Sequence, residues 1–279
     1  MPLTPTDEIV RRARAAGTGV GAFNVLQLEH AQAIVAGAEN ADRPVVLQIS
    51  ENTVRYHGAL EPVALASLAV ARAAKTPVAV HLDHAENPDL VREAVALGLG
   101  SVMFDASKLP YAENVAATRE VVEYCHSHSH GVWVEAELGE VGGKGGAHTP
   151  GVRTDPEEAR AYVAATGVDA LAVAVGSSHQ MTTRDAVLDL DLIARLRAAV
   201  DVPLVLHGSS GVADPHLTEA VVAGMTKVNV STHLNKAFTE AVRAHLAEHP
   251  TTVDPRHYLT PARAAVAREV AHLLAVLTP

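Results

Sequence analysis

Residues 77–104 read PVAVHLDHAENPDLVREAVALGLGSVMF, and this stretch contains the repeating unit of the chain. Two short apolar runs, Pro77–Leu82 and Ser101–Phe104, flank a segment with helical spacing, Pro88–Leu97. The runs are continuous rather than alternating, which is typical of parallel strands buried on both faces. Asn87, just before the middle segment, is a helix-start signal. The stretch therefore predicts a strand, a helix and a second strand parallel to the first.

The same unit recurs along the chain, with helical spacing again at residues 28–40, 61–74 and 192–199. Eight strand–helix repeats predict a closed (β/α)8 TIM barrel, and we expect one such domain over residues 1–279. An open, doubly wound sheet would commonly have fewer strands and a Gly-rich turn after the first, which FNVLQLEH at residues 23–30 lacks. The predicted strands are Val20–Val25, Val45–Ile49, Pro77–Leu82, Ser101–Phe104, Val132–Glu137, Ala170–Val175, Pro203–Leu206 and Thr226–Val230.

The composition narrows the class of protein. The chain has 279 residues, a net charge of −10 and no dense Lys/Arg cluster, so a nucleic-acid partner is not expected. The single cysteine, Cys125, excludes an intramolecular disulfide and fits a reducing compartment. The chain shows neither a signal peptide nor an apolar stretch long enough to span a membrane, so we expect a cytoplasmic protein. An acidic protein that binds an anion needs local backbone amides or a metal ion to do so.

Histidines follow three of the predicted strands, where the working residues of such barrels sit. The third strand runs into His81-Leu82-Asp83-His84, the sixth is followed by His179, and the seventh ends in His207. One strand-end histidine is more often structural, but three on one rim match a catalytic zinc site with an open position. Asp83 can serve as a base beside such a metal. Because neighbours in a strand point to opposite faces, we expect a break in the strand between Asp83 and His84.

Two further features lie at the same end of the barrel. The runs Gly208-Ser209-Ser210-Gly211 and Asn229-Val230-Ser231-Thr232 follow the last two strands, the recurrent phosphate site of these barrels. Glycines let backbone N–H groups approach a phosphate, and the hydroxyls add donors. The Gly-rich stretch at about residues 139–153 is expected to form a lid over the site, with a disordered insertion as the alternative. Carboxylates also end the fourth and fifth strands, at Asp105, Glu135 and Glu137.

These motifs resemble those of the class II, zinc-dependent ketose-bisphosphate aldolases, the family of fructose- and tagatose-1,6-bisphosphate aldolases. The similarity covers nearly the whole chain, and the motifs occur in the order of the family. The motifs are AFNV at 22–25, HLDH at 81–84, SVMFDAS at 101–107, VEAELG at 134–139, AVAVGSSH at 172–179, VLHGSSG at 205–211 and KVNVST at 227–232.

The resemblance implies a lyase that cleaves a phosphorylated ketose reversibly to dihydroxyacetone phosphate and an aldehyde. It implies that His84, His179 and His207 bind the catalytic Zn²⁺ and that Asp83 is the acid/base. It places Asp105 and Glu137 near the metal, as partners of the ligands or as an alternative metal position. The residues that it implies for the sugar pocket and the phosphate are Asn24, Ser50, Gly208, Ser210, Asn229 and Thr232.

The resemblance also implies a monovalent cation (Na⁺ or K⁺) near the phosphate and a homodimer or homotetramer. Some family members complete the site with an arginine from a neighbouring subunit, for which Arg256 and Arg263 are candidates here. Lys227 lies at the eighth strand, but a zinc mechanism needs no lysine Schiff base. The family places such enzymes in carbohydrate metabolism, including glycolysis.

Three departures from the family pattern predict a paralogue with a different acceptor aldehyde. The lid sequence at 142–146 is GGKGG, without the carboxylate that often donates a proton in this family. Gln180 stands where a phosphate-contacting glycine commonly follows the zinc histidine, and Ala85 replaces the usual glycine after HLDH. A catalytically silent sugar-phosphate-binding protein and a zinc-dependent hydrolase on the same barrel remain alternatives, although strand one lacks the His-x-His pair common in such hydrolases. The configuration at C4 of the substrate is left open.

Overall fold

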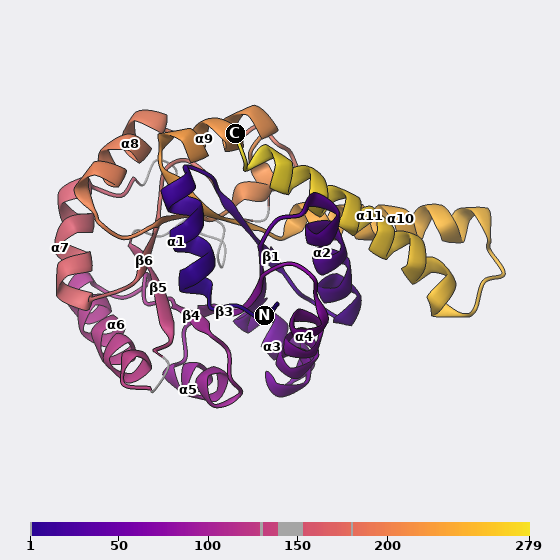
Figure 1. Cartoon of the computed structure of the whole chain (residues 1–279), viewed down its shortest axis with the longest axis horizontal. Coiled ribbons are helices and arrows are strands. Elements are labelled where there is room, and N and C mark those ends of the chain that lie inside the picture. Colours follow the sequence, from indigo (N-terminus) through magenta and orange to yellow (C-terminus); the bar gives the residue numbers. More distant parts are fainter. Residues whose placement is uncertain (1, 129–130, 139–152, 180) are drawn as a thin grey trace.

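Eight parallel strands form a closed barrel in the computed structural model of the chain (Figure 1). The structure describes residues 2–128, 131–138, 153–179 and 181–279. The strands pair in chain order, and β8 pairs with β1, for example at Ala22 and Asn229. This confirms the predicted (β/α)8 barrel. The strands are β1 (Val20–Asn24), β2 (Val45–Ser50), β3 (Val78–Ala85), β4 (Ser101–Phe104), β5 (Trp133–Leu138), β6 (Ala170–Val173), β7 (Leu204–Leu206) and β8 (Met225–Val230).

Helices surround the barrel, and the predicted helical segments match α2, α4, α5 and α8 (Figure 1). The start signal at Asn87 is a true cap, because its side chain accepts a hydrogen bond from the Asp89 N–H at 2.9 Å. The helices are α1 (Thr6–Ala16), α2 (Leu28–Ala41), α3 (Glu51–His57), α4 (Glu61–Ala73), α5 (Pro88–Ala96), α6 (Tyr111–His126), α7 (Pro156–Thr166), α8 (Leu190–Ala199), α9 (Asp214–Ala223), α10 (Thr232–Glu248) and α11 (Pro255–Val276), with a short 3₁₀ turn η1 (Ser209–Gly211).

Helix α1 precedes the first strand and closes the amino end of the barrel. Its buried residues Ile9 and Ala13 form a cluster with Val20, Val46 and other inward-facing residues of the strands. The amino end is therefore a packed floor, and the opposite end carries the loops that can hold a site.

Helices α10 and α11 form a hairpin that extends away from the barrel (Figure 1). The returning helix α11 packs against α2, where Gly37 lets the two helices approach closely. A Cβ atom at Gly37 would lie 2.5 Å from the carbonyl oxygen of Ala267. Glycine costs about 1 kcal/mol relative to alanine inside a helix, so this contact explains why it is used there.

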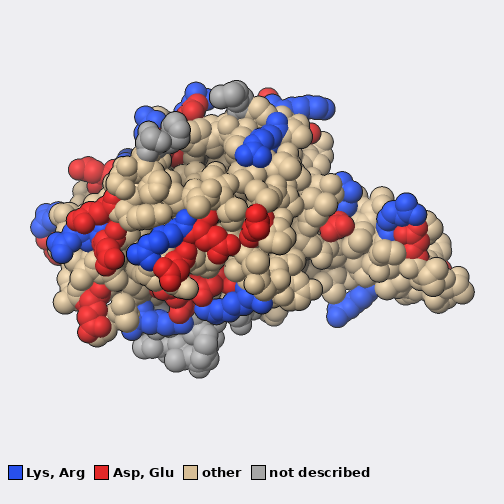
Figure 2. All heavy atoms as spheres, turned by 90° about the horizontal axis from the view of Figure 1, so that it is seen from below, with Lys and Arg blue, Asp and Glu red and all other residues tan. Residues whose placement is uncertain are grey.

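The surface carries both signs of charge. On the face shown in Figure 2, acidic and basic side chains lie next to one another, and the protruding end also carries both. Among the described residues, we find no helix with the length and apolar character needed to span a lipid bilayer.

Strand β3 contains the break expected between Asp83 and His84. His84 has a φ of 49°, in the left-handed region that few residues other than glycine adopt. The pairing of β3 with β4 shifts in register between Leu82 and Ala85. This irregularity gives the two neighbours different orientations, so that both can contribute to one site.

Candidate metal centre and surrounding site

The interior of the barrel combines an apolar cluster packed against α1 with a set of buried polar side chains. Buried polar side chains from β2, β5 and β8 contact one another although these strands are not neighbours in the sheet. Such contacts can only cross the interior of the barrel. The polar residues of this interior are Asn24, Gln48, His81, Asp83, Ser101, Glu135, Glu137, His207, Lys227 and Asn229, each no more than 8% exposed.

Three histidines and one glutamate at the carboxyl end could hold a metal ion. His84, Glu137, His179 and His207 each offer a ligand atom, and these atoms all lie within 4.8 Å of one another. The ring centroid of His84 lies 4.6 Å from that of His207 and 5.1 Å from that of His179. Three imidazoles and a carboxylate oxygen are a donor set that suits Zn²⁺.

Neighbouring carboxylates orient two of these rings. His84 Nδ1 lies 2.9 Å from Asp105 Oδ2, which leaves Nε2 to face the cluster. His207 Nε2 donates to Glu135 Oε1 at 2.8 Å, and its Nδ1 lies 3.1 Å from Glu137 Oε2, within the cluster. A carboxylate on the outer nitrogen fixes the tautomer and orientation of a metal-binding histidine. The geometry therefore assigns Nε2 of His84 and Nδ1 of His207 as the atoms available to a metal.

The charge balance around His207 favours a cation at this position. Burial lowers the pKa of His207, but its hydrogen bonds to Glu135 and Glu137 raise that pKa to about 9. Burial likewise acts to raise the pKa of Glu135, yet Lys227 and His207 hold it well below its usual range. Glu135 and Glu137 thus flank one imidazole, and positive charge at this point is favourable beside them.

Glu135 was identified at the end of the fifth strand, but no role was assigned to it from the sequence. Its signal was the alternation with Glu137, which places both carboxylates on the inward face of β5. Nothing in the sequence indicates that Glu135 contacts His207 and Lys227, because His207 directly follows β7 and Lys227 lies on β8, neither of which pairs with β5.

Asp83 is buried beside the cluster and receives two amide groups. Its side chain accepts from Asn24 Nδ2 and from Asn229 Nδ2, both at 3.4 Å, and lies 4.0 Å from His84 Nε2. Burial acts to raise the pKa of Asp83, but the charges of His84 and His207, with smaller effects of Lys227 and His81, lower it overall. Asp83 is therefore held as a carboxylate, the form that accepts a proton.

The loops after β6 and β7 lie against each other, which positions His179 next to His207. Gly208 has a φ of 66°, and a Cβ atom there would lie 2.6 Å from the backbone of Ser178. The two loops also pair at Ala186 and Val212, and Ala186 N–H donates to Gly211 O at 2.9 Å. Glycine at 208 is therefore required both by its backbone conformation and by this close approach.

The predicted phosphate-binding residues lie together at this end of the barrel. Ser210, in η1, accepts hydrogen bonds from the N–H groups of Ser231 and His233 at 3.3 and 3.2 Å. Thr232 is the first residue of α10, a helix of 17 residues whose amino terminus is a favourable position for an anion. The loop after β7 and the start of α10 are thus joined by hydrogen bonds to the Ser210 hydroxyl.

The other predicted residues are distributed differently. Ser50 ends β2 and caps α3, since its hydroxyl accepts from Thr53 N–H at 3.2 Å. Lys227 is fully buried inside the barrel. Arg256 and Arg263 lie on α11 in the protruding hairpin, and Arg256 binds Asp254 at 2.6 Å. Gln180 and nearly all of the predicted lid, residues 139–152, lie outside the described residues.

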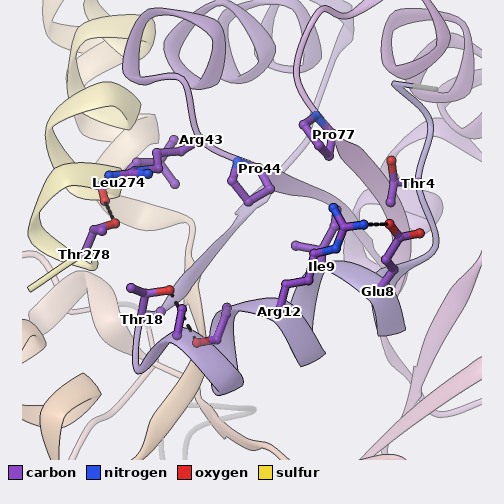
Figure 3. A pocket seen from close by; sticks show the side chains of 13 residues that line it. Thr4, Glu8, Ile9, Arg12, Thr18, Arg43, Pro44, Pro77, Leu274 and Thr278 are labelled. Carbon is purple, nitrogen blue, oxygen red and sulfur yellow. Dashed lines mark hydrogen bonds and ion pairs between the residues drawn. The ribbon is translucent and has the colours of Figure 1, made fainter.

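A separate hollow of about 300 Å³ lies at the opposite end of the barrel (Figure 3). It is lined by α1, by residues just before β1, β2 and β3, and by the end of α11. Its charged side chains include Glu8 and Arg12, which pair with each other at 2.6 Å. No residue of the metal-capable cluster lines it, so this hollow is distinct from the candidate site.

Known proteins share both this fold and the family pattern. The family model "Fructose-bisphosphate aldolase class-II" matches residues 4–278. The crystal structure of the YdjI aldolase from Escherichia coli K12 is 30% identical with a TM-score of 0.87, and the match covers 99% of this chain and 97% of that one. A putative fructose-1,6-bisphosphate aldolase from Coccidioides immitis is 28% identical, with a TM-score of 0.85 and coverage of 98% and 96%. Fructose-bisphosphate aldolase from Campylobacter jejuni, at 21% identity and a TM-score of 0.82 over 99% and 95% of the chains, shares the fold.

The fold and the family match together define a carbon–carbon lyase on a TIM barrel. The chain belongs to the class II fructose-bisphosphate aldolase family, whose members depend on a metal ion.

Proposed function

We propose that this aldolase uses Zn²⁺ held by His84, His179 and His207. The observation that carries the proposal is the convergence of these three imidazoles and Glu137 within 4.8 Å at the carboxyl end of the barrel. Asp105 and Glu135 orient two of the rings, and Glu137 either completes the donor set or provides an alternative metal position. Bound there, the metal would act as a Lewis acid on the oxygens of the substrate.

Asp83 is proposed as the acid/base. Cleavage requires removal of a hydroxyl proton next to the bond that breaks, and a buried carboxylate with a lowered pKa is available for it. Asn24 and Asn229 hold both carboxylate oxygens, which keeps the base oriented. A metal-dependent cleavage needs no lysine nucleophile, and the ammonium group of Lys227 is paired with Glu135 at 2.9 Å.

The phosphate of the substrate is proposed to bind where η1 meets the start of α10. Gly208, Ser210, Asn229 and Thr232 offer backbone N–H groups, hydroxyls and an amide, and the helix terminus adds favourable electrostatics. Asn24 and Ser50 would line the sugar pocket, and Gln180 would contribute near the phosphate. A monovalent cation beside the phosphate is part of the same proposal.

The proposed reaction is reversible cleavage of a phosphorylated ketose to dihydroxyacetone phosphate and an aldehyde. Fructose-1,6-bisphosphate, tagatose-1,6-bisphosphate and related ketose 1-phosphates are the candidate substrates, in carbohydrate metabolism such as glycolysis. The GGKGG sequence of the lid and the changes at Ala85 and Gln180 favour a different acceptor aldehyde from that of the family.

We further propose a single barrel domain with a lid over the site, in a cytoplasmic homodimer or homotetramer. The protruding hairpin α10–α11 supports the oligomer, because it extends away from its own barrel (Figure 1). Arg256 or Arg263 on this hairpin would then reach the site of a neighbouring subunit.

A substrate panel tests the proposed reaction. The purified protein is incubated with fructose-1,6-bisphosphate, tagatose-1,6-bisphosphate and several ketose 1-phosphates, and release of dihydroxyacetone phosphate is followed with a coupled dehydrogenase. Release from at least one of them is expected, and the best substrate identifies the acceptor. If zinc-loaded protein releases nothing from any of them, the assignment to phosphorylated ketoses is wrong.

A further inference from the structure

Lys227 occupies the centre of the polar interior of the barrel. Its side chain is fully buried, and its ammonium group lies 2.9 Å from Glu135 Oε2, 2.8 Å from Asn229 Oδ1 and 3.4 Å from Gln48 Oε1. These three contacts use the three N–H donors of a charged lysine. The glutamate supplies the compensating charge that a buried ammonium group needs.

A lysine determines how neighbouring amides point, because it can only donate. Gln48 and Asn229 must each turn their carbonyl oxygen toward Lys227 Nζ, which directs their NH₂ groups away from it. The NH₂ group of Gln48 then donates to Asn24 Oδ1 at 2.7 Å. Asn24 is oriented in turn, with its own NH₂ group on the far side.

Two chains of hydrogen bonds, here called relays, run from Lys227 to Asp83. One passes through Gln48 and Asn24, and the other passes through Asn229. Asn24 Nδ2 donates to Asp83 Oδ2, and Asn229 Nδ2 donates to Asp83 Oδ1, each at 3.4 Å. One ammonium group thus fixes the orientation of three amides. Together with the carboxylate of Asp83, they form a closed ring of hydrogen bonds. Without a donor at position 227, each amide could turn by 180° and present oxygen to Asp83, which would repel it.

We propose that Lys227 is a positioning residue for the reaction, which orients Asn24 and Asn229 so that their N–H groups hold both oxygens of Asp83. The inference rests on the proposed role of Asp83 as acid/base. Lys227 donates to the amides of Gln48 and Asn229, and it acts on Asp83 through these amides. Its main contribution is therefore to the chemical step, through Asp83, with a smaller one to substrate binding through the amide of Asn229.

The test compares Lys227→Met, Gln48→Met and the double variant with the wild type. Lys227→Met should lower kcat about 10- to 100-fold, the usual cost of losing a residue that orients a reacting group, with a smaller rise in KM and little change in zinc content. Gln48→Met breaks one of the two relays without a change of charge and should lower kcat by a smaller factor. The double variant should have the same kcat as Lys227→Met, because both changes act through the same relay.

Ser101→Ala is the matched control. Ser101 is equally buried in the interior and bonds His81 and Thr6 instead, so this variant should lower the melting temperature but leave kcat unchanged. If Lys227→Met fails to fold because Glu135 is left unpaired, Lys227→Met with Glu135→Gln restores the charge balance. A Gln48→Met variant with wild-type kcat, or losses that multiply in the double variant, would overturn the proposal.

A neutron structure of the metal-free protein separates this proposal from the proposed function. In the wild type, the deuterons of Asn24 and Asn229 should lie on the nitrogens that face Asp83, whether or not the protein cleaves any ketose. In Lys227→Met, at least one of the three amides should be reversed. Unchanged amide orientations in the variant would show that Lys227 does not set them, even if the enzyme proves to be an aldolase.

Discussion

At the scale of single residues, Asp83 and His84 are assigned different tasks although they are neighbours. The positive φ of His84 turns its ring toward His179 and His207, while Asp83 keeps the inward orientation of a regular strand residue. The base therefore lies beside the metal-capable cluster without belonging to it. The two functions should be separable by mutation.

Asp83→Asn should abolish cleavage and leave metal binding intact. The amide is nearly isosteric but cannot accept the proton, so kcat should fall by roughly 10²- to 10⁴-fold. Zinc content, measured by mass spectrometry, should stay at the wild-type value because the four ligand atoms are unchanged. A variant that loses its zinc as well would contradict the separate assignment of Asp83. If neither form cleaves a ketose while both bind zinc, a silent sugar-phosphate-binding protein is favoured.

At the scale of elements, the loops after β6 and β7 act as one unit. Arg184 Nε donates to the carbonyl of Val212 at 2.8 Å, and its Nη2 pairs with Asp214 at 2.5 Å, where His272 from α11 also binds. These contacts hold the segment that follows His179 against the loop that follows His207. Both ligands are thereby fixed relative to each other.

Arg184→Met should weaken zinc binding although Arg184 does not belong to the metal-capable cluster. Loss of the charged hydrogen bonds costs about 1–2 kcal/mol, so the zinc dissociation constant should rise roughly 5- to 30-fold in a chelator competition assay. Arg195→Met, on the exposed face of α8 after the same loop, is the control and should bind zinc as the wild type does. Equal affinities in both variants would show that the loops are positioned without this clamp.

His30 links α2 to α10 and should make stability depend on pH. It is 4% exposed and stacks on Phe238 at 4.8 Å, and burial lowers its pKa to about 4. The unfolded chain therefore binds a proton near pH 6.5 that the folded chain does not bind until about pH 4, so stability falls as the pH drops through this range. Between pH 7 and pH 4.5, the free energy of unfolding should fall by about 2–3 kcal/mol less in His30→Leu than in the wild type, as measured by urea denaturation at each pH.

The control for this prediction is His249→Leu, at the exposed end of α10, which should keep the wild-type dependence on pH. An unchanged slope in His30→Leu would mean that His30 becomes charged within the folded protein.

Most strands and helices could be predicted from the sequence, but several contacts between them could not. Every predicted strand is present within a few residues, because continuous apolar runs report burial on both faces, and the break after Asp83 followed from two polar neighbours at a strand end. The roles of α1 as a floor and of α10–α11 as a hairpin were not predicted, because both depend on what the closed barrel leaves uncovered. The pairing of Glu135 with Lys227 was likewise missed, since their depth in the barrel follows from the strand registers. The roles of the site residues themselves remain predictions.

At the scale of the whole molecule, the outer end of the hairpin α10–α11 extends beyond the part of α11 that packs against α2 (Figure 1). Its tip carries exposed apolar side chains, with Val253 at 92% and Leu246 at 37% exposure. Arg256 and Arg263 lie on its returning helix. A neighbouring subunit would cover this surface and receive an arginine.

Mixing inactive variants tests this arrangement and distinguishes the two arginines. Asp83→Asn is mixed with Arg256→Gln, and separately with Arg263→Gln, under conditions that exchange subunits. If one arginine serves the neighbouring site, its variant is inactive alone, and the mixture recovers about a quarter of wild-type activity through one intact site in each hybrid dimer. Arg268→Gln, on the same helix, should be fully active. Full activity of both Arg256→Gln and Arg263→Gln would show that no shared arginine is needed.

The zinc dependence of ketose cleavage tests the central claim most directly. The protein is stripped with a chelator, titrated with Zn²⁺ and assayed for release of dihydroxyacetone phosphate from its best substrate. We expect no cleavage without metal and full recovery at one zinc per chain, with recovery lost when His207 is replaced by alanine. Cleavage by the metal-free protein, or full recovery in His207→Ala, would contradict a zinc centre built on these histidines.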